Sequence, residues 1–254
     1  MELPTIWIRF IVTGGVTGIL GDLQKLEASI QTSPQFLGLQ ATSFGRCAYL
    51  SVPRSQMSAA AKPVLRVAGI SGSIREASWH RGLIRAAAEI CEDSIPGLRV
   101  DDLDIADLPM LNTDLETDGG RGFPPTVEAF RAKVRDVDCF LFASPEYNYS
   151  ITSPLKNALD WASRGVNCWA DKPGAIVCAG ANFGGGRSSY HLRQVGVLLD
   201  IHFINKPELF VFSFYEPGKF FDGDGNLIDA ETRERLKKVL LSLQAFTLRL
   251  QKKD

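Results

Sequence analysis

From residue 64 to the C-terminus, short apolar runs alternate with segments of helical periodicity, and this alternation limits the possible folds more than any other feature. Runs that are apolar throughout and end at glycine or serine are typical of buried parallel strands. Segments whose apolar residues recur every three or four positions are typical of amphipathic helices. The expected strands are 64–70, 98–103, 139–143, 175–179 and 208–212. The expected helices are 78–92, 126–137, 154–164, 188–200 and 230–250.

Strands that alternate with helices along the chain predict an α/β fold, in which a mostly parallel sheet is covered by helices on both faces. Five strands in this arrangement fit the strand order 2-1-3-4-5 of a flavodoxin-like three-layer sandwich. In such a sheet a ligand binds beyond the carboxyl ends of the strands, at the point where the strand order changes direction. We therefore expect the binding site in the loops that follow the first, third and fourth strands.

The charge balance and the cysteine pattern exclude several classes of function. The chain carries 28 Lys and Arg against 29 Asp and Glu, without the basic surplus that a nucleic-acid binder needs. No apolar run approaches the roughly 18 residues of a spanning helix, so no stable membrane insertion is expected. The cysteines form no C-x-x-C pair and the histidines are isolated, so we expect no disulfide framework, no metal site and a reducing compartment. Cys139 and Cys178 lie in apolar runs and are interpreted as small core residues.

Residues 1–62 differ in composition and are assigned to an N-terminal extension, which leaves residues 63–254 as the ligand-binding domain. Between Ala28 and Pro63 there is no Asp or Glu, while Ser, Thr, Gln and Ala are frequent. An acid-poor, serine-rich leader that carries arginines is typical of an organelle transit peptide. A disordered extension is the other interpretation, and the acidic residues before Ala28 count in its favour.

The first candidate site is Gly-Ile-Ser-Gly-Ser-Ile-Arg at 69–75, where the first expected strand runs into a helix. Backbone N–H groups and the dipole at a helix start favour an anion. Ser71 and Ser73 add hydroxyl donors, Arg75 adds a fixed positive charge, and Ser78 can cap the helix. The loop matches neither G-x-x-x-x-G-K-[ST] nor G-x-G-x-x-G, which argues against a nucleoside triphosphate or a dinucleotide. We interpret it as a phosphate-binding loop.

The second candidate is Ser-Pro-Glu-Tyr-Asn-Tyr-Ser at 144–150, directly after the third expected strand. Two aromatic side chains, an amide and a proline at a strand end form a rigid rim suited to a flat ring. Backbone N–H groups could bond the polar edge of such a ring, and Tyr147 could stack on it or line the pocket. The alternative is a buried turn whose tyrosines fill space.

The third candidate is Gly-Ala-Asn-Phe-Gly-Gly-Gly-Arg at 180–187, after the fourth expected strand. Three successive glycines permit positive φ angles and let a ligand approach the backbone amides closely. A flexible connector is the alternative. Because all three loops are expected at the same edge of the sheet, we expect them to form one site.

Taken together, these loops resemble those of the NADPH-dependent FMN reductase family, and most closely the plant NADPH:quinone oxidoreductases within it. The resemblance rests on 69–75 with Ser78, on 144–150, and on Ser-Pro-Leu-Lys-Asn-Ala-Leu-Asp-Trp at 153–161. It implies a homo-oligomer, a dimer or tetramer, that holds FMN non-covalently and uses NADPH or NADH as co-substrate. Residues 1–62 have no counterpart in the resemblance, so a cytoplasmic protein is expected, or a chloroplast protein if these residues act as a transit peptide.

The resemblance also assigns roles to single residues. Those that match the family's phosphate-binding positions are Ser71, Ser73, Arg75 and Ser78. Those that match the loops along the flavin ring are Pro145, Glu146, Tyr147, Asn148, Gly184, Gly185 and Gly186. Arg187 is the first candidate for the 2′-phosphate of NADPH and Arg164 the second, while Tyr147 and Tyr149 are candidate proton donors to a quinone. Four further matching residues are interpreted as packing and subunit contacts: Lys156, Asn157, Asp160 and Trp161.

The implied activity is that of an FMN-dependent NAD(P)H:quinone oxidoreductase, which reduces quinones by two electrons to hydroquinones with ping-pong kinetics. A neighbouring alternative is a reductase of free flavin, azo dyes or metal oxyanions. A different class is a non-enzymatic flavodoxin-like electron carrier. A carrier would need a strongly acidic docking face, which a net charge of −1 does not indicate.

Overall fold

The chain was analysed as a computed structural model, which describes residues 6–11, 40–44, 47–52, 64–216 and 218–252. It divides into two compact units, Met1–Lys62 and Pro63–Asp254.

The first unit contains three described strands, β1 (Ile6–Ile11), β2 (Gln40–Phe44) and β3 (Cys47–Val52). They form an antiparallel sheet in the order β1-β3-β2. These strands lie within the extension that is interpreted above as disordered or as a transit peptide. The sequence of β1 is rich in β-branched and aromatic residue types, which are favoured in strands. The rest of the extension, on which the transit-peptide interpretation also depends, lies outside the described residues.

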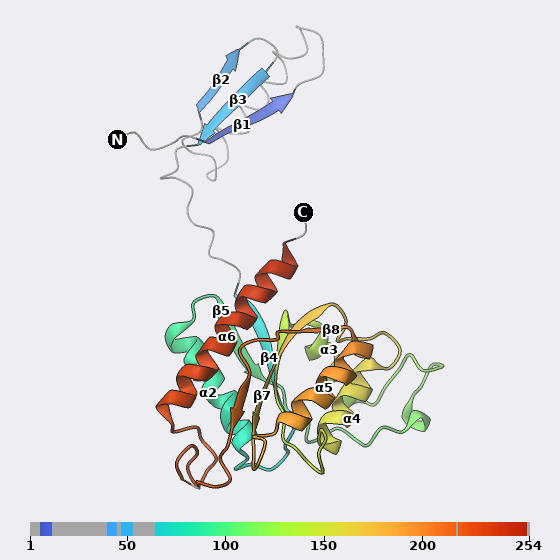
Figure 1. Cartoon of the computed structure of the whole chain (residues 1–254). Helices are drawn as coiled ribbons and strands as arrows, with labels where there is room; N and C mark the ends of the chain where they lie inside the picture. The colour runs from blue at the N-terminus through green and yellow to red at the C-terminus, as the bar shows by residue number, and fades with distance from the viewer. Residues whose placement is uncertain (1–5, 12–39, 45–46, 53–63, 217, 253–254) are drawn as a thin grey trace. The chain divides into compact units, whose positions relative to one another are not determined.

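The second unit is built on a parallel sheet in the order β5-β4-β6-β7-β8 (Figure 1). Its strands are β4 (Leu65–Ser71), β5 (Leu98–Asp102), β6 (Cys139–Ala143), β7 (Lys172–Ala179), β8 (Ile201–Phe203) and β9 (Leu209–Val211). The predicted flavodoxin-like order is thereby confirmed. One difference is that two short strands share the fifth position, since β8 pairs with the start of β7 and β9 pairs with its end. Pro207 lies between them and has no N–H to donate to a neighbouring strand.

Helices cover both faces of this sheet (Figure 1). On one face, α2 (Trp79–Ser94) and α6 (Ala230–Gln251) pack against β4, β5, β6 and β7. On the other face lie α3 (Pro125–Arg135), α4 (Ser153–Ser163) and α5 (Gly186–Leu199). The unit is therefore the three-layer sandwich that the alternating pattern predicts.

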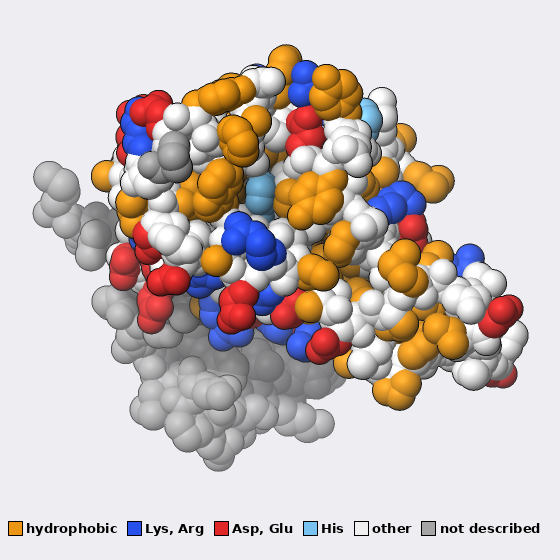
Figure 2. Space-filling view, turned by 90° about the horizontal axis from the view of Figure 1, so that it is seen from below, with side chains coloured by type: hydrophobic (Ala, Val, Ile, Leu, Met, Phe, Trp, Pro, Cys, Tyr) orange, Lys and Arg blue, Asp and Glu red, His pale blue; other side chains and the backbone are white. Residues whose placement is uncertain are grey.

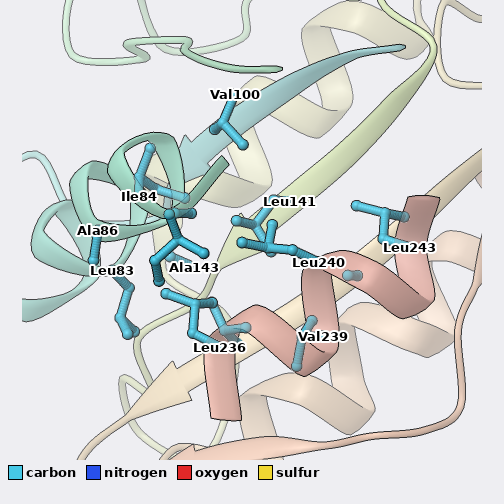
Figure 3. Close-up of a cluster of buried hydrophobic side chains, with 14 of the residues drawn as sticks. Leu83, Ile84, Ala86, Val100, Leu141, Ala143, Leu236, Val239, Leu240 and Leu243 are labelled. Atoms are coloured by element: carbon cyan, nitrogen blue, oxygen red, sulfur yellow. The ribbon is translucent and has the colours of Figure 1, made fainter. Parts of the chain in front are cut away.

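Successive side chains of the central strands enter opposite cores, as the twofold periodicity of a strand requires. On β4, Val67 belongs to the core under α2 and α6, while Ala68 and Ile70 belong to the core under α3, α4 and α5. Figure 3 shows the first of these cores, to which α2 contributes Leu83, β6 contributes Leu141 and α6 contributes Leu240. Burial on both faces explains why the central strands read as continuous apolar runs.

None of the helices in the described part of the chain is both long enough and apolar enough to cross a membrane. Cys139 and Cys178 are fully buried, which confirms their interpretation as core residues. Burial raises the pKa of both thiols to about 12, so neither is a ready nucleophile.

Candidate functional site

The carboxyl ends of β4, β6 and β7 meet at one edge of the sheet, and the three predicted loops follow them there. Ser71 of β4 is in register with Ala143 of β6, which in turn is in register with Val177 of β7. Figure 2 looks at this edge from below, and in this view hydrophobic side chains surround a histidine and a Lys or Arg side chain. Backbone from three distant segments therefore lines one surface.

The first of these is the phosphate loop, residues 72–78, and it is shaped by its own serine hydroxyls. Ser71 Oγ accepts the N–H of Ser73 at 3.2 Å and donates to the carbonyl of Ser73 at 3.1 Å. Ser73 Oγ accepts the N–H of Arg75 at 3.3 Å, and Ser78 Oγ caps α2 by accepting the N–H of His80 at 3.2 Å. The hydroxyl hydrogens of Ser73 and Ser78 are thus left free for a ligand, whereas that of Ser71 is used within the loop.

Positive charge and a free amide complete the phosphate loop. Arg75 is exposed, and it forms no ion pair with any described residue. Within the described residues, the N–H of Ile74 also has no hydrogen-bond acceptor, although the N–H groups on both sides of it are bonded. A guanidinium, two hydroxyls and a free amide at a helix start match the donor set that binds a phosphate.

The phosphate loop is locked to the second loop through Gly72. Its N–H donates to the carbonyl of Ala143 at 2.8 Å, and its carbonyl accepts from Thr152 Oγ1 at 2.5 Å. A Cβ at this position would lie 2.8 Å from Pro145 Cδ, so only glycine fits without a shift. Pro145 is buried and packs against Gly72 of the phosphate loop.

The second loop, residues 144–150, ends in a tight turn that carries two tyrosines into solvent. Tyr147 and Ser150 exchange two backbone hydrogen bonds of 3.0 Å. Asn148 and Tyr149 between them have φ angles of 50° and 67°, a left-handed geometry that asparagine tolerates well. Tyr147 and Tyr149 are 54% and 65% exposed, so these rings stand at the rim and do not fill a buried space.

In the third loop, residues 180–187, the glycines are required by close packing. Gly184 and Gly185 have φ angles of 56° and 86°. A Cβ on Gly185 would lie 2.7 Å from Cys178 Cβ, and one on Gly184 would lie 2.9 Å from Phe210 Cβ. The backbone of this loop is therefore closely packed, and α5 begins with Gly186 at the same edge of the sheet. The alternative of a flexible connector does not fit this packing.

Arg187 joins the second and third loops. Its Nη1 lies 3.0 Å from Glu146 Oε1, and its backbone N–H donates to Glu146 Oε2 at 3.1 Å. The guanidinium carbon lies 4.0 Å from the ring centre of Tyr149 and 4.5 Å from that of Phe183. Arg164 is also paired, with Glu116 through Nε and Nη2 at 2.5 and 3.0 Å. Neither candidate for the 2′-phosphate is therefore a free cation.

Sequence reasoning missed His80, which lies inside this site on the first turn of α2. The side chain is buried, and its Nε2 accepts the N–H of Ala179, the last residue of β7, at 3.2 Å. Burial lowers the pKa of His80 to about 3. A histidine within a helical segment has no local pattern that would have marked it.

The predicted packing role fits two of the residues that follow the second loop, Trp161 and Asn157. Trp161 is fully buried and donates from Nε1 to the carbonyl of Pro109 at 2.7 Å, while Asn157 Nδ2 donates to the same carbonyl at 2.9 Å. Lys156 and Asp160 form an ion pair one helical turn apart. In the described part of the chain, no three His, Cys, Asp or Glu side chains come together to hold a metal.

Comparison with known proteins agrees with this geometry. The family model described as NADPH-dependent FMN reductase matches residues 65–216, which include all three loops. The chain belongs to the NADPH-dependent FMN reductase family. Among curated members, a "Probable NADPH:quinone oxidoreductase 1" of Oryza sativa subsp. japonica is 76% identical over 77% of this chain and 98% of its own length. The "NADPH:quinone oxidoreductase" of Arabidopsis thaliana is 61% identical over 76% of this chain and 97% of its own length.

A solved structure shares the fold. The flavoenzyme NAD(P)H:(acceptor) oxidoreductase FerB from Paracoccus denitrificans superposes with a TM-score of 0.61 and 27% identity. The alignment covers 74% of this chain and 98% of FerB.

The residues at the sheet edge fit the FMN that the NADPH-dependent FMN reductase family name implies. Counting only partners among the described residues, the phosphate loop offers an unpaired cation, free hydroxyl hydrogens and the free Ile74 amide, which suit the phosphate of a mononucleotide. The two tyrosines and the closely packed glycine loop lie beside it at the same edge, as a flat ring would require.

Proposed function

We propose that this chain is an FMN-dependent NAD(P)H:quinone oxidoreductase, which reduces quinones by two electrons to hydroquinones. The observation that carries this proposal is the high identity to plant proteins that are named NADPH:quinone oxidoreductases, over the unit that contains all three loops. NADPH or NADH and a proton are consumed, and the oxidised nicotinamide and the hydroquinone are released.

In this proposal the phosphate loop holds the FMN phosphate with Ser73, Ser78, Arg75 and the amide of Ile74, while Ser71 keeps the loop in shape. Residues 144–150 and 184–186 flank the ring. FMN held there would supply the hydride-transfer chemistry that links a nicotinamide donor to a quinone acceptor.

The rim tyrosines act at the stage where the quinone oxygens are protonated. Tyr147 and Tyr149 are exposed beside the ring-binding loops, where a phenol could donate a proton to a quinone oxygen. Because a nicotinamide and a quinone would use the same surface in turn, the kinetics should be ping-pong.

The decisive experiment is anaerobic stopped-flow spectroscopy of the FMN-loaded protein, mixed first with NADPH and then with a benzoquinone. Loss of the flavin absorbance in the first step and its return in the second would support the proposal. Protein that stays colourless after saturation with FMN would contradict it.

Reduction of free flavin is a second candidate, because a protein named NAD(P)H-dependent FMN reductase from Pseudomonas aeruginosa is 42% identical over 73% of this chain. Steady-state rates on benzoquinones, azo dyes and free FMN separate the candidates. The quinone proposal requires the highest kcat/KM on a quinone.

We propose further that the protein is a homo-oligomer, a dimer or a tetramer. Exposed apolar side chains at the end of α5 support this, since Val197 and Leu198 are 82% and 87% exposed. Leu198→Lys is expected to shift the protein to a smaller species in light scattering coupled to size exclusion. An unchanged mass would exclude this surface as the contact.

We propose the cytoplasm as the location, with the chloroplast as the alternative if residues 1–62 act as a transit peptide. The four cysteines of the second unit are free, which suits a reducing compartment. Imaging of a C-terminal fluorescent fusion, with and without residues 1–62, decides between the two.

A further inference from the structure

We propose that His80 is a positioning residue, whose imidazole fixes the phosphate loop relative to the glycine loop and thereby aligns the two ends of the FMN site. This inference rests on the proposed function, because it takes FMN as the ligand. His80 is the second residue of α2, directly after the cap Ser78, and is 5% exposed. Its imidazole therefore lies at the junction of the phosphate loop and α2.

The partner of His80 is a backbone amide that the sheet itself leaves without an acceptor. Amides of successive strand residues point to alternate neighbouring strands. The N–H of Gly180 donates to the carbonyl of Val211 in β9, so the preceding Ala179 amide points toward β6, which has already ended at Ala143. His80 Nε2 accepts this amide at 3.2 Å. Without it a buried N–H would be unpaired, which is costly.

The charge state of the imidazole suits this role. Nε2 can accept a hydrogen bond only when it carries no proton, and burial lowers the pKa of His80 to about 3. Arg75 is the charged group that acts on the ring, and it also disfavours the protonated form. The imidazole is therefore neutral over the working pH range, and the positive charge of the phosphate loop stays at Arg75.

The hydrogen bond connects the two halves of the site by a short path. Ser73, Arg75 and Ser78 precede His80 on one side, while the glycine loop follows Ala179 directly on the other. FMN must contact both halves together, whereas riboflavin lacks the phosphate and needs only the ring-binding half. If the phosphate loop and the glycine loop lose their alignment, the binding of FMN should consequently weaken more than the binding of riboflavin.

The test compares the dissociation constants of FMN and riboflavin, measured by flavin fluorescence titration on the full chain. His80→Leu removes the acceptor at similar volume, while His80→Gln places an amide oxygen within reach of the Ala179 amide. His202→Leu is the matched control, because His202 lies on β8 and its Nε2 is 3.0 Å from the exposed Asp171.

His80→Leu is expected to raise the FMN dissociation constant about tenfold, a loss of about 1.4 kcal/mol, with the riboflavin constant unchanged. The Gln variant should restore most of the FMN affinity, and the His202 control should not differ from wild type. If the Leu variant does not fold, His80→Asn withdraws the acceptor while keeping an amide, and the same shift is expected.

If the dissociation constants of FMN and riboflavin rise by the same factor, or if neither rises, the positioning role is overturned and His80 contributes to stability alone. The proposed function fails separately, when the wild-type chain itself binds neither flavin.

Discussion

The contact between Glu146 and Arg187 ties together two loops whose sequences are 41 residues apart. The carboxylate is 15% exposed and the guanidinium 33% exposed, and two aromatic rings flank the guanidinium. This degree of shielding makes the pair stronger than a fully solvated one. From the sequence, Arg187 was assigned to the 2′-phosphate of NADPH. In the structure, its guanidinium pairs with the carboxylate of Glu146.

We expect Arg187→Gln to lower kcat/KM about fivefold for NADPH and for NADH alike. The substitution removes the ion pair with Glu146, a loss of about 1 kcal/mol that does not depend on the 2′-phosphate. Steady-state kinetics with both nucleotides measure this. A loss confined to NADPH would instead support the 2′-phosphate role, and Arg164→Gln serves as the comparison.

His80 also predicts how stability depends on pH. Its pKa falls from 6.5 in the unfolded chain to about 3 in the folded one, so the unfolded state binds the extra proton between these values. The contribution of the neutral His80 ring to the free energy of unfolding is therefore fully present above pH 6.5 and is lost as the pH falls toward 3.

Between about pH 7 and pH 5 this loss should amount to about 2 kcal/mol in the free energy of unfolding. Urea titrations of wild type and His80→Gln at both values measure it, since the variant lacks the titrating ring. Equal losses in the two proteins would show that other groups cause the effect. Carboxyl groups with lowered pKa values, such as Asp229, act only at lower pH.

At the scale of whole elements, the N-terminus of α2 has both a structural and a ligand-binding function. Ser78 caps the helix through Oγ, and its hydroxyl hydrogen remains available for an anion. Asp229 caps α6 in the same way by accepting the N–H of Thr232 at 2.7 Å. Both side chains cap a helix, but only Ser78 adjoins the phosphate loop.

Ser78→Ala is expected to lower the free energy of unfolding by about 1 kcal/mol and also to weaken FMN binding. Asp229→Ala should cost a similar amount of stability while leaving FMN affinity unchanged. Thermal unfolding and fluorescence titration measure the two effects. If both variants lose FMN affinity equally, the phosphate is not held at Ser78.

The elements show which features a sequence can reveal. The central strands are buried on both faces, so their unbroken apolar runs marked β4, β6 and β7 and led to the correct strand order. β8 was missed because three residues are too few to show any periodicity. The strands of the first unit were missed because composition outweighed a strand signal in β1.

Within the candidate site, the loops were predictable and their internal contacts were not. Serine and glycine at strand ends have a local physical meaning, since they favour turns, caps and anions. The partners of His80 and Arg187 come from segments 99 and 41 residues away, and no local pattern encodes such pairs. Side-chain partners of this kind depend on the assembled sheet.

At the scale of the whole molecule, the division at Lys62 separates two units that each have their own sheet. The family model and all three loops fall in the second unit. The contacts described above for the three loops are made within the second unit.

A chain that begins at Pro63 is therefore expected to fold and to bind FMN with the affinity of the full chain. Circular dichroism and flavin titration of the two proteins check this. A truncated chain that folds but binds FMN more weakly would show that residues 1–62 take part in the site.

The division of the fifth strand position between β8 and β9 affects how readily the sheet could aggregate at high protein concentration. A long, regular edge strand offers unpaired amides to which another chain can add, and proteins avoid this with short or charged edges. Here one edge consists of two three-residue strands, and the other, β5, carries Arg99 and Asp101. Neither edge offers a template for strand addition, so the native sheet should resist the growth of β-aggregates.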